Sequence, residues 1–125
     1  MPLARLDKKF FPFFDSVKNP VSESGTSPSF HNNGYTSMTI EVSNATTIAA
    51  HVEGCVNIKN ANDGDLEDNE CHWTPLKLIN LTTLEQVDGM NDNGIYLLTL
   101  CGCQRIRVVV ENITGTATIL SVSEV

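Results

Sequence analysis

The sequence YTSMTIEVS at residues 35–43 carries the clearest secondary-structure signal in this chain of 125 residues. Met38, Ile40 and Val42 fall on one side of an extended strand, and small or polar residues fall on the other side. Alternation with a period of two is typical of a β-strand that is buried on one face only. The stretch therefore predicts a β-fold whose core contacts this face.

Segments that follow this stretch repeat the same signal. Clusters of turn-forming residues separate them, as at Asn91-Asp92-Asn93-Gly94. The nearest helical candidate, residues 76–86, is weakened by Pro75, Thr82 and Thr83. Short strands at this spacing predict an all-β fold, an antiparallel β-sandwich of jelly-roll type. Further strands are predicted at residues 46–53, 55–59, 73–81, 95–100, 105–110 and 116–122.

The first 33 residues differ from the rest, because their apolar residues show no sustained period. Prolines interrupt this segment repeatedly, and residues 22–29 have the composition of a linker. We therefore predict an extended N-terminal arm at residues 1–33 and a β-sandwich domain at residues 34–125. The arm is too apolar to remain in water, so its rings are expected to fill a groove on the chain's own domain or on a partner. The predicted partner-binding residues are Phe10, Phe11, Phe13 and Phe14.

The charge of the chain limits the partners that it is expected to bind. The net charge is -7 and the pI is about 4.7. An acidic chain repels the phosphates of nucleic acid, so no nucleic acid is expected as a partner. No segment approaches the roughly 20 apolar residues that span a bilayer, and the N-terminus lacks the pattern of a signal peptide. We therefore expect no membrane contact and a protein that stays in the cytoplasm where it is made.

The four cysteines, Cys55, Cys71, Cys101 and Cys103, allow more than one interpretation. Two disulfides would suit a secreted protein, whereas buried thiols suit a reducing cytoplasm, which we favour. Zinc is a competing hypothesis, since Cys71-His72 and Cys101-Gly102-Cys103 offer soft ligands, but the usual Cys-x2-Cys spacing is missing. The acidic residues at 60–70 offer oxygen ligands for calcium without the spacing of an EF-hand. No metal or other cofactor is therefore predicted.

Sequence motifs that indicate catalysis are missing. The chain contains no Gly-x-Ser-x-Gly elbow and no glycine-rich phosphate loop. His31, His51 and His72 are interpreted as surface or structural residues. Carboxylates are plentiful, but their spacing singles out no pair for sugar hydrolysis. An enzyme is therefore not expected.

Several short motifs occur in a fixed order over residues 36–125. They are Val52-Glu53-Gly54, Asn62-Asp63-Gly64, Trp73-Thr74-Pro75-Leu76, Asn80–Thr83, Gly94-Ile95-Tyr96, Gly102 with Arg105–Val108, and Thr114–Thr118. In the order and spacing of these motifs the segment resembles a β-sandwich module of small virion proteins from tailed bacteriophages. Trp73 is expected to fill the gap between two sheets.

This resemblance implies a structural role in a virion that is assembled in the host cytoplasm. Related modules act as capsid decoration (cement) proteins, head fibres, or tail and baseplate attachment pieces, and they commonly form trimers. The implied partners are the major capsid protein or another virion protein and, as a homotrimer, two further copies of the chain. The outward-facing Val109 also favours a trimer. A short chain with an arm favours decoration of the head, and a tail adaptor or a carbohydrate-binding receptor component is the alternative.

Overall fold

The computed structural model describes residues 8–17, 19–56, 71–100 and 102–125, and every regular element in these ranges is a β-strand. The pairings between the strands are antiparallel, which confirms the predicted all-β antiparallel class. These ranges hold no helix that is long and apolar enough to cross a membrane. The strands are β1 (Lys8–Phe14), β2 (Gly25–Thr26), β3 (Phe30–His31), β4 (Ser37–Cys55), β5 (Thr74–Leu76), β6 (Leu78–Asn80), β7 (Glu85–Val87), β8 (Gly94–Thr99) and β9 (Arg105–Glu124).

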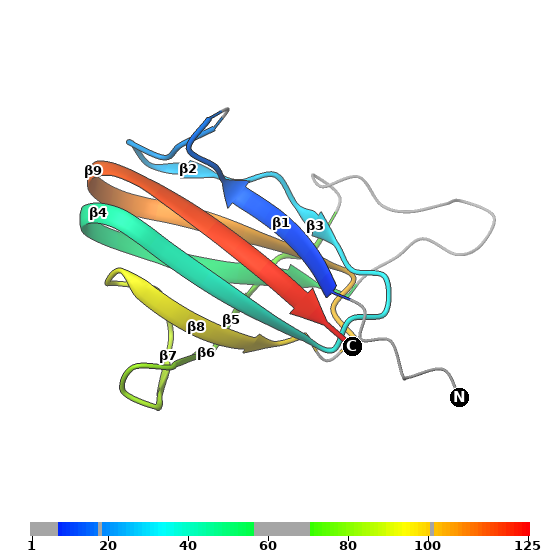
Figure 1. Ribbon diagram of the computed structural model, residues 1–125. Helices are drawn as coiled ribbons and strands as arrows, with labels where there is room; N and C mark the ends of the chain where they lie inside the picture. The colour runs from blue at the N-terminus through cyan, green and yellow to red at the C-terminus, as the bar shows by residue number, and fades with distance from the viewer. Residues whose placement is uncertain (1–7, 18, 57–70, 101) are drawn as a thin grey trace, which may run out of the picture.

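Two long strands, β4 and β9, pair with each other in the middle of the sheet. They pair from Ser37↔Glu124 at one end to Cys55↔Arg105 at the other. The strand order is β1-β9-β4-β8-β6-β7, while β2 and β3 also pair with β9, and β5 pairs with β4. Figure 1 shows the long pair doubling back on itself, so that the sheet forms two layers. The strands thus form one continuous folded sheet instead of the two separate sheets that a β-sandwich contains.

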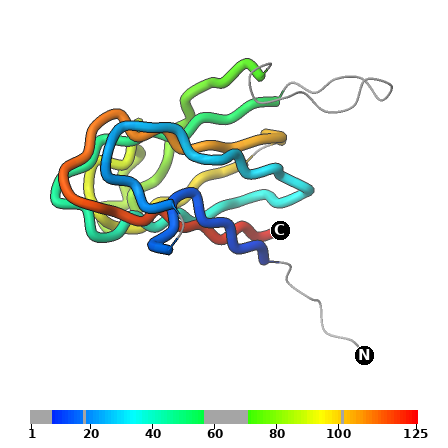
Figure 2. The backbone as a smooth tube through the Cα atoms, turned by 90° about the horizontal axis from the view of Figure 1, so that it is seen from above, coloured from blue at the N-terminus to red at the C-terminus, as the bar shows by residue number. Residues whose placement is uncertain are grey.

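Each layer contains one half of the long pair. The first layer contains the N-terminal half of β4 and the C-terminal half of β9, flanked by β1 and by β8 with its neighbours β6 and β7. The second layer contains the other two halves, flanked by β2 and β3 on one side and by β5 on the other. Figure 2 shows the two layers from above, with β1 beside the end of β9.

The bend in the long pair lies between segments that are predicted from the sequence as separate strands. Asn44 and Gly115 have positive φ angles of 71° and 89°, and the register shifts around Ala45. At Gly115 a Cβ atom would lie 2.8 Å from the Oγ1 atom of Thr46, so the close approach also requires glycine. Irregularities of this type bend a strand without ending its pairing. The strands predicted at residues 35–43 and 46–53 are therefore the two halves of β4. Those predicted at residues 105–110 and 116–122 are the two halves of β9.

The core lies between the two layers. The inward alternation predicted for β4 is confirmed, because Met38, Ile40 and Val42 are buried. The prediction for Trp73 is wrong, since this side chain is only half-buried and lies under Arg107. The large aromatic residue that fills the core from β8 is Tyr96, whose hydroxyl group donates a hydrogen bond to the carbonyl oxygen of Asp92. Other buried residues of the hydrophobic core include Phe13, Phe30, Val52, Leu98, Ile106, Val108, Val110 and Ile119.

Strands β1, β2 and β3 and the bridge residue Val21 lie in the segment predicted as an N-terminal arm at residues 1–33, and all of them pair with β9. Strand β1 pairs with β9 from Lys8↔Glu124 to Phe14↔Ile119, and Val21 forms a bridge with Ala117. The register of β1 shifts between Pro12 and Phe14, which interrupts the alternation along the strand. This irregularity explains why the segment shows no period in the sequence.

Candidate functional site

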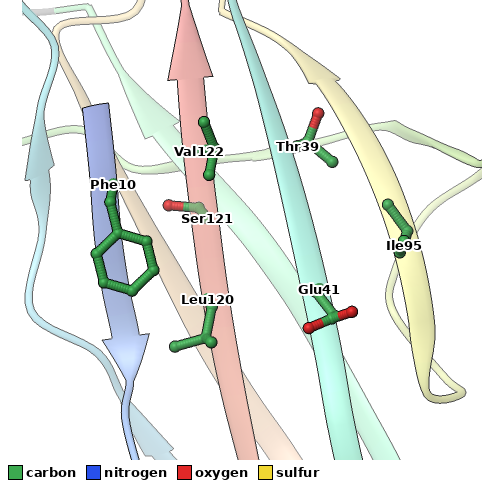
Figure 3. A pocket seen from close by; sticks show the side chains of 7 residues that line it. All are labelled: Phe10, Thr39, Glu41, Ile95, Leu120, Ser121 and Val122. Atoms are coloured by element: carbon green, nitrogen blue, oxygen red, sulfur yellow. The ribbon is translucent and has the colours of Figure 1, made fainter. Parts of the chain in front are cut away.

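The two outer faces of the long β4–β9 pair differ in chemistry. On the first layer, outward residues of β4 and β9 and their neighbours form a shallow groove with a volume of about 290 Å³. The lining residues stand on the neighbouring strands β1, β9, β4 and β8, and Figure 3 shows how their side chains lie. We call this surface the apolar groove. It is lined by Phe10, Thr39, Glu41, Ile95, Leu120, Ser121 and Val122.

The structure separates the four phenylalanines that are predicted to bind a partner. Phe10 is 57% exposed and lines the apolar groove. Phe11 is half-buried, with its ring edge-on to Phe13 and Phe30 at centroid distances of 5.1 and 5.4 Å. Phe13 and Phe14 are 0% and 5% exposed, so the protein's own core encloses them. Phe13 and Phe14 are therefore enclosed by the protein itself, and Phe10 is the most exposed of the four predicted partner-binding residues.

The outer face of the second layer carries a cluster of ionisable side chains. The Glu53 carboxylate accepts hydrogen bonds from Arg107, with Nε 2.8 Å and Nη2 2.7 Å from Oε1. The two ring nitrogens of His51 contact carboxylates, with Nε2 2.8 Å from Oε2 of Glu53 and Nδ1 against Glu111. The guanidinium carbon of Arg107 lies 4.2 Å from the ring centroid of Trp73, a cation–π contact. We call these residues the charged cluster.

Opposite charges shift the pKa values within the charged cluster. Burial by itself lowers the pKa of His51, but its hydrogen bonds to Glu53 and Glu111 outweigh this effect and raise the pKa above 6.5. Burial by itself raises the pKa of Glu53, but hydrogen bonds from His51 and Arg107 lower it below 4.5. The protonated imidazole and the two carboxylates satisfy one another. The arrangement is therefore an ion-pair network across β4 and β9, and it offers no unpaired base.

This network predicts a pH dependence of stability. The contribution of His51 to the free energy of unfolding is complete below pH 6.5, and it is lost as the pH rises through the raised pKa of His51. The contribution of Glu53 is complete above pH 4.5 and is lost as the pH falls through its lowered pKa. We expect His51→Gln to destabilise the fold most between these two values, by about 0.2–1 kcal/mol, the range for partly exposed ion pairs. Urea unfolding at a series of pH values measures the difference.

A matched control for this measurement is His31→Gln, at an exposed histidine on β3. We expect its effect on stability to be small, because His31 lies outside the charged cluster. A constant difference between wild type and His51→Gln from pH 5 to pH 9 would show that the network does not stabilise the fold through the charge of His51.

The cysteines and the proposed metal ligands form no recognisable metal site in the described ranges. Cys55, Cys71 and Cys103 are buried, and Arg105 Nη1 lies 4.0 Å from the sulfur of Cys71. Cys101 and the acidic residues 60–70 lie outside the described residues, as does the turn predicted at 62–64. Within the described part of the chain, no group of three or more His, Cys, Asp or Glu side chains is placed to hold a metal ion.

The apolar groove was not recognised in the sequence, although a signal for it was present. In the predicted last strand Ala117, Ile119 and Ser121 alternate with Thr118, Leu120 and Val122, so both sides carry aliphatic residues. Such a strand is buried on both faces or exposes apolar side chains on one of them. The structure shows the second case, because Val122 is 36% exposed and Ile95, on the neighbouring β8, is 41% exposed.

Comparison with known proteins identifies the fold but no family. No protein-family model matches the chain, and no curated protein matches it in sequence. Two solved structures have the same fold with a TM-score of 0.80. One is the SPBc2 prophage-derived protein YomS, with 15% identity over 100% of this chain and 99% of that chain. The other is the PBSX exported protein XepA, with 12% identity over 100% of this chain and 40% of that chain.

Proposed function

We propose that this chain is a structural protein of a bacteriophage particle, and that it acts as a capsid decoration protein on the outer surface of the head. The observation that carries this proposal is the full-length likeness to YomS, which is described as prophage-derived. Almost the whole of each chain takes part in this likeness. The same fold is therefore used, without added domains, by a protein that a prophage encodes.

Two features of the described surface support a binding role. In the charged cluster, His51 and Glu53 are occupied by partners within the protein. The apolar groove instead leaves aliphatic and aromatic side chains in contact with water, a property of protein interaction sites. A decoration protein acts through contact area and shape complementarity, for which such a surface is suited. We accordingly propose a binding protein whose partner is the major capsid protein or another virion protein.

One observation favours a second candidate function. This fold makes up 40% of the longer XepA chain, which is described as an exported protein. The fold thus also serves as one part of a larger protein. A tail or baseplate adaptor, or a receptor-binding component that recognises carbohydrate, is the corresponding alternative for this chain.

Separated heads and tails of the phage that encodes the chain distinguish the two functions. We expect purified, fluorescently labelled protein to bind heads and to leave tails unlabelled after gradient centrifugation. We also propose that the bound form is a homotrimer, to which the half-buried Val109 contributes, and cross-linking of the head fraction measures this. Binding to tails alone would favour the adaptor, and binding to neither fraction would contradict a virion role.

A further inference from the structure

We propose that the apolar groove is the attachment site, and that its occupant is a segment of another virion protein that carries aliphatic side chains and one lysine or arginine. This inference rests on the proposed function and names the chemistry of the partner. The argument uses the exposure of the groove, the contrast between the two outer faces, the state of the sheet edges and the position of Glu41.

The groove exposes apolar side chains that could be covered at little cost. Phe10, Ile95 and Val122 are 57%, 41% and 36% exposed, and they extend from β1 across the sheet to β8. Leu120 lies beside them and is half-buried. Because these residues stand on paired strands, their backbone is already ordered before a partner arrives. Binding there loses little backbone entropy, which is the main cost of ordering a flexible segment.

The outer face of the second layer carries a different set of side chains on the same two strands. There, outward residues of β4 and β9 are His51, Glu53 and Arg107, which pair with one another. The equivalent outward positions in the first layer include Thr39 on β4 and Val122 on β9, with no comparable network among the described residues. The difference between the faces is therefore local to the groove, and it marks the first layer as the contact surface.

The sheet edges favour contact through the face. Strand β1 is an edge strand that contains Pro12, which has no N–H group, and it begins with Lys8 and Lys9. Strand β5 contains Pro75, and the opposite edge, β7, is only three residues long. Proline, lysine and short length all discourage the addition of a further strand. A partner is therefore held by side chains that enter the groove, and not by backbone pairing at an edge.

The charge of the occupant follows from Glu41. This residue is exposed within the groove, and it takes part in none of the ion pairs found among the described residues. A lysine or arginine on the occupant would pair with it at the centre of an apolar contact. A second copy of this chain fits poorly, because a two-fold contact through this face brings Glu41 near its own equivalent and each copy has a net charge of -7. The complementary partner is a different protein with a basic residue.

Photo-cross-linking on intact particles identifies the occupant directly. A photoreactive amino acid at position 122 should cross-link to a virion protein, and mass spectrometry should place the linked residue among aliphatic residues with a lysine or arginine nearby. The same amino acid at position 84 is the control, because Leu84 is 75% exposed but lies outside the groove. Carbodiimide treatment should join Glu41 to a partner lysine when the basic residue is a lysine, and Glu41→Gln should remove that product.

Binding of labelled variants to purified heads supplies the quantitative test. We expect Ile95→Thr with Val122→Thr to weaken binding about tenfold or more, as for loss of central interface contacts. Glu41→Lys should weaken binding and reverse its salt dependence, whereas Glu85→Lys, on the exposed edge strand β7, should change it little. Both threonine replacements retain β-branched side chains, and circular dichroism and urea unfolding check that each variant is folded.

The outcomes separate this inference from the proposed function. Wild-type binding to heads with unchanged affinity in the groove variants would overturn the groove and leave the decoration role standing. Cross-links from position 122 to a second copy of the chain, or to an acidic segment, would overturn the stated occupant. Failure of the wild-type protein to bind heads or tails would overturn the virion role and, with it, this inference.

Discussion

Replacement of Phe13 by alanine is expected to lower the free energy of unfolding by about 3–5 kcal/mol, the range for removal of a large core aromatic side chain. Phe13 is fully buried, and its ring contacts the edge of Phe11 at a centroid distance of 5.1 Å. The cavity is expected to remain partly unfilled, because the neighbouring rings are fixed by strands β1 and β3. A loss of this size is a large fraction of the stability of an ordinary domain.

The neighbouring Phe10 supplies a matched control for this prediction. It lies in the same strand and is 57% exposed, so Phe10→Ala should change stability by about 0.5 kcal/mol or less. Urea unfolding followed by circular dichroism measures both variants under one set of conditions. Similar losses for the two variants would show that β1 does not distinguish a core side from a surface side. A stable Phe13→Ala variant would restore the interpretation of the segment as a separate arm.

The parts of the fold that were predicted correctly depend on local alternation. Met38, Ile40 and Val42 were placed inward because each is two residues from the next, and all three are buried. In the strand predicted at residues 105–110, Ile106, Val108 and Val110 alternate in the same way, and all three are buried. In a strand with one buried face, apolar and polar residues alternate, so the sequence itself indicates which face is buried. The all-β class could therefore be predicted without knowledge of which strands pair.

The position of the N-terminal segment could not be predicted in this way. Its environment is set by residues that are distant in the chain, since the Ser121 hydroxyl donates a hydrogen bond to the carbonyl oxygen of Phe11 across 110 positions. The shift in register between Pro12 and Phe14 also breaks the alternation that would have revealed a core-facing strand. The concentration of phenylalanine was a correct sign of burial. It did not show whether the covering surface belonged to the same chain.

The candidate site was predicted only in part, for a related reason. Phe10 was proposed as a partner-binding residue, and the structure places it at the apolar groove. Ile95 and Val122 were missed because each looks like an ordinary strand residue. Their exposure depends on the arrangement of the whole sheet, in which none of the described residues forms a further layer over β8 and β9 at this point. The charged cluster was also missed, since His51 and Arg107 come together only when β4 pairs with β9.

Gly89→Ala is the second substitution for which we expect a large effect, a loss of about 1–3 kcal/mol, as for other groups forced into a packed region. A Cβ atom at this position would lie 2.6 Å from the carbonyl oxygen of Ala50. That oxygen accepts a hydrogen bond of 2.7 Å from the N–H group of Met90, and the reverse bond measures 3.2 Å. The backbone cannot move away without lengthening this pair of bonds, so the steric conflict and the loss of hydrogen bonding act together.

Gly25→Ala is the matched control, because a Cβ atom there would have no other atom within 4 Å. We expect this substitution to be neutral or to stabilise the fold by up to about 1 kcal/mol, since alanine restricts the unfolded chain more than glycine does. The two variants should therefore shift the midpoint of urea unfolding in different directions or by clearly different amounts. The Ala50–Met90 bridge joins the second-layer half of β4 to the segment just before β8. Strand β8 itself belongs to the first layer. If Gly89→Ala left stability unchanged, this bridge would not be a rigid link between the layers, and the two halves of the folded sheet would depend on side-chain packing and on the bend in β4 and β9 alone.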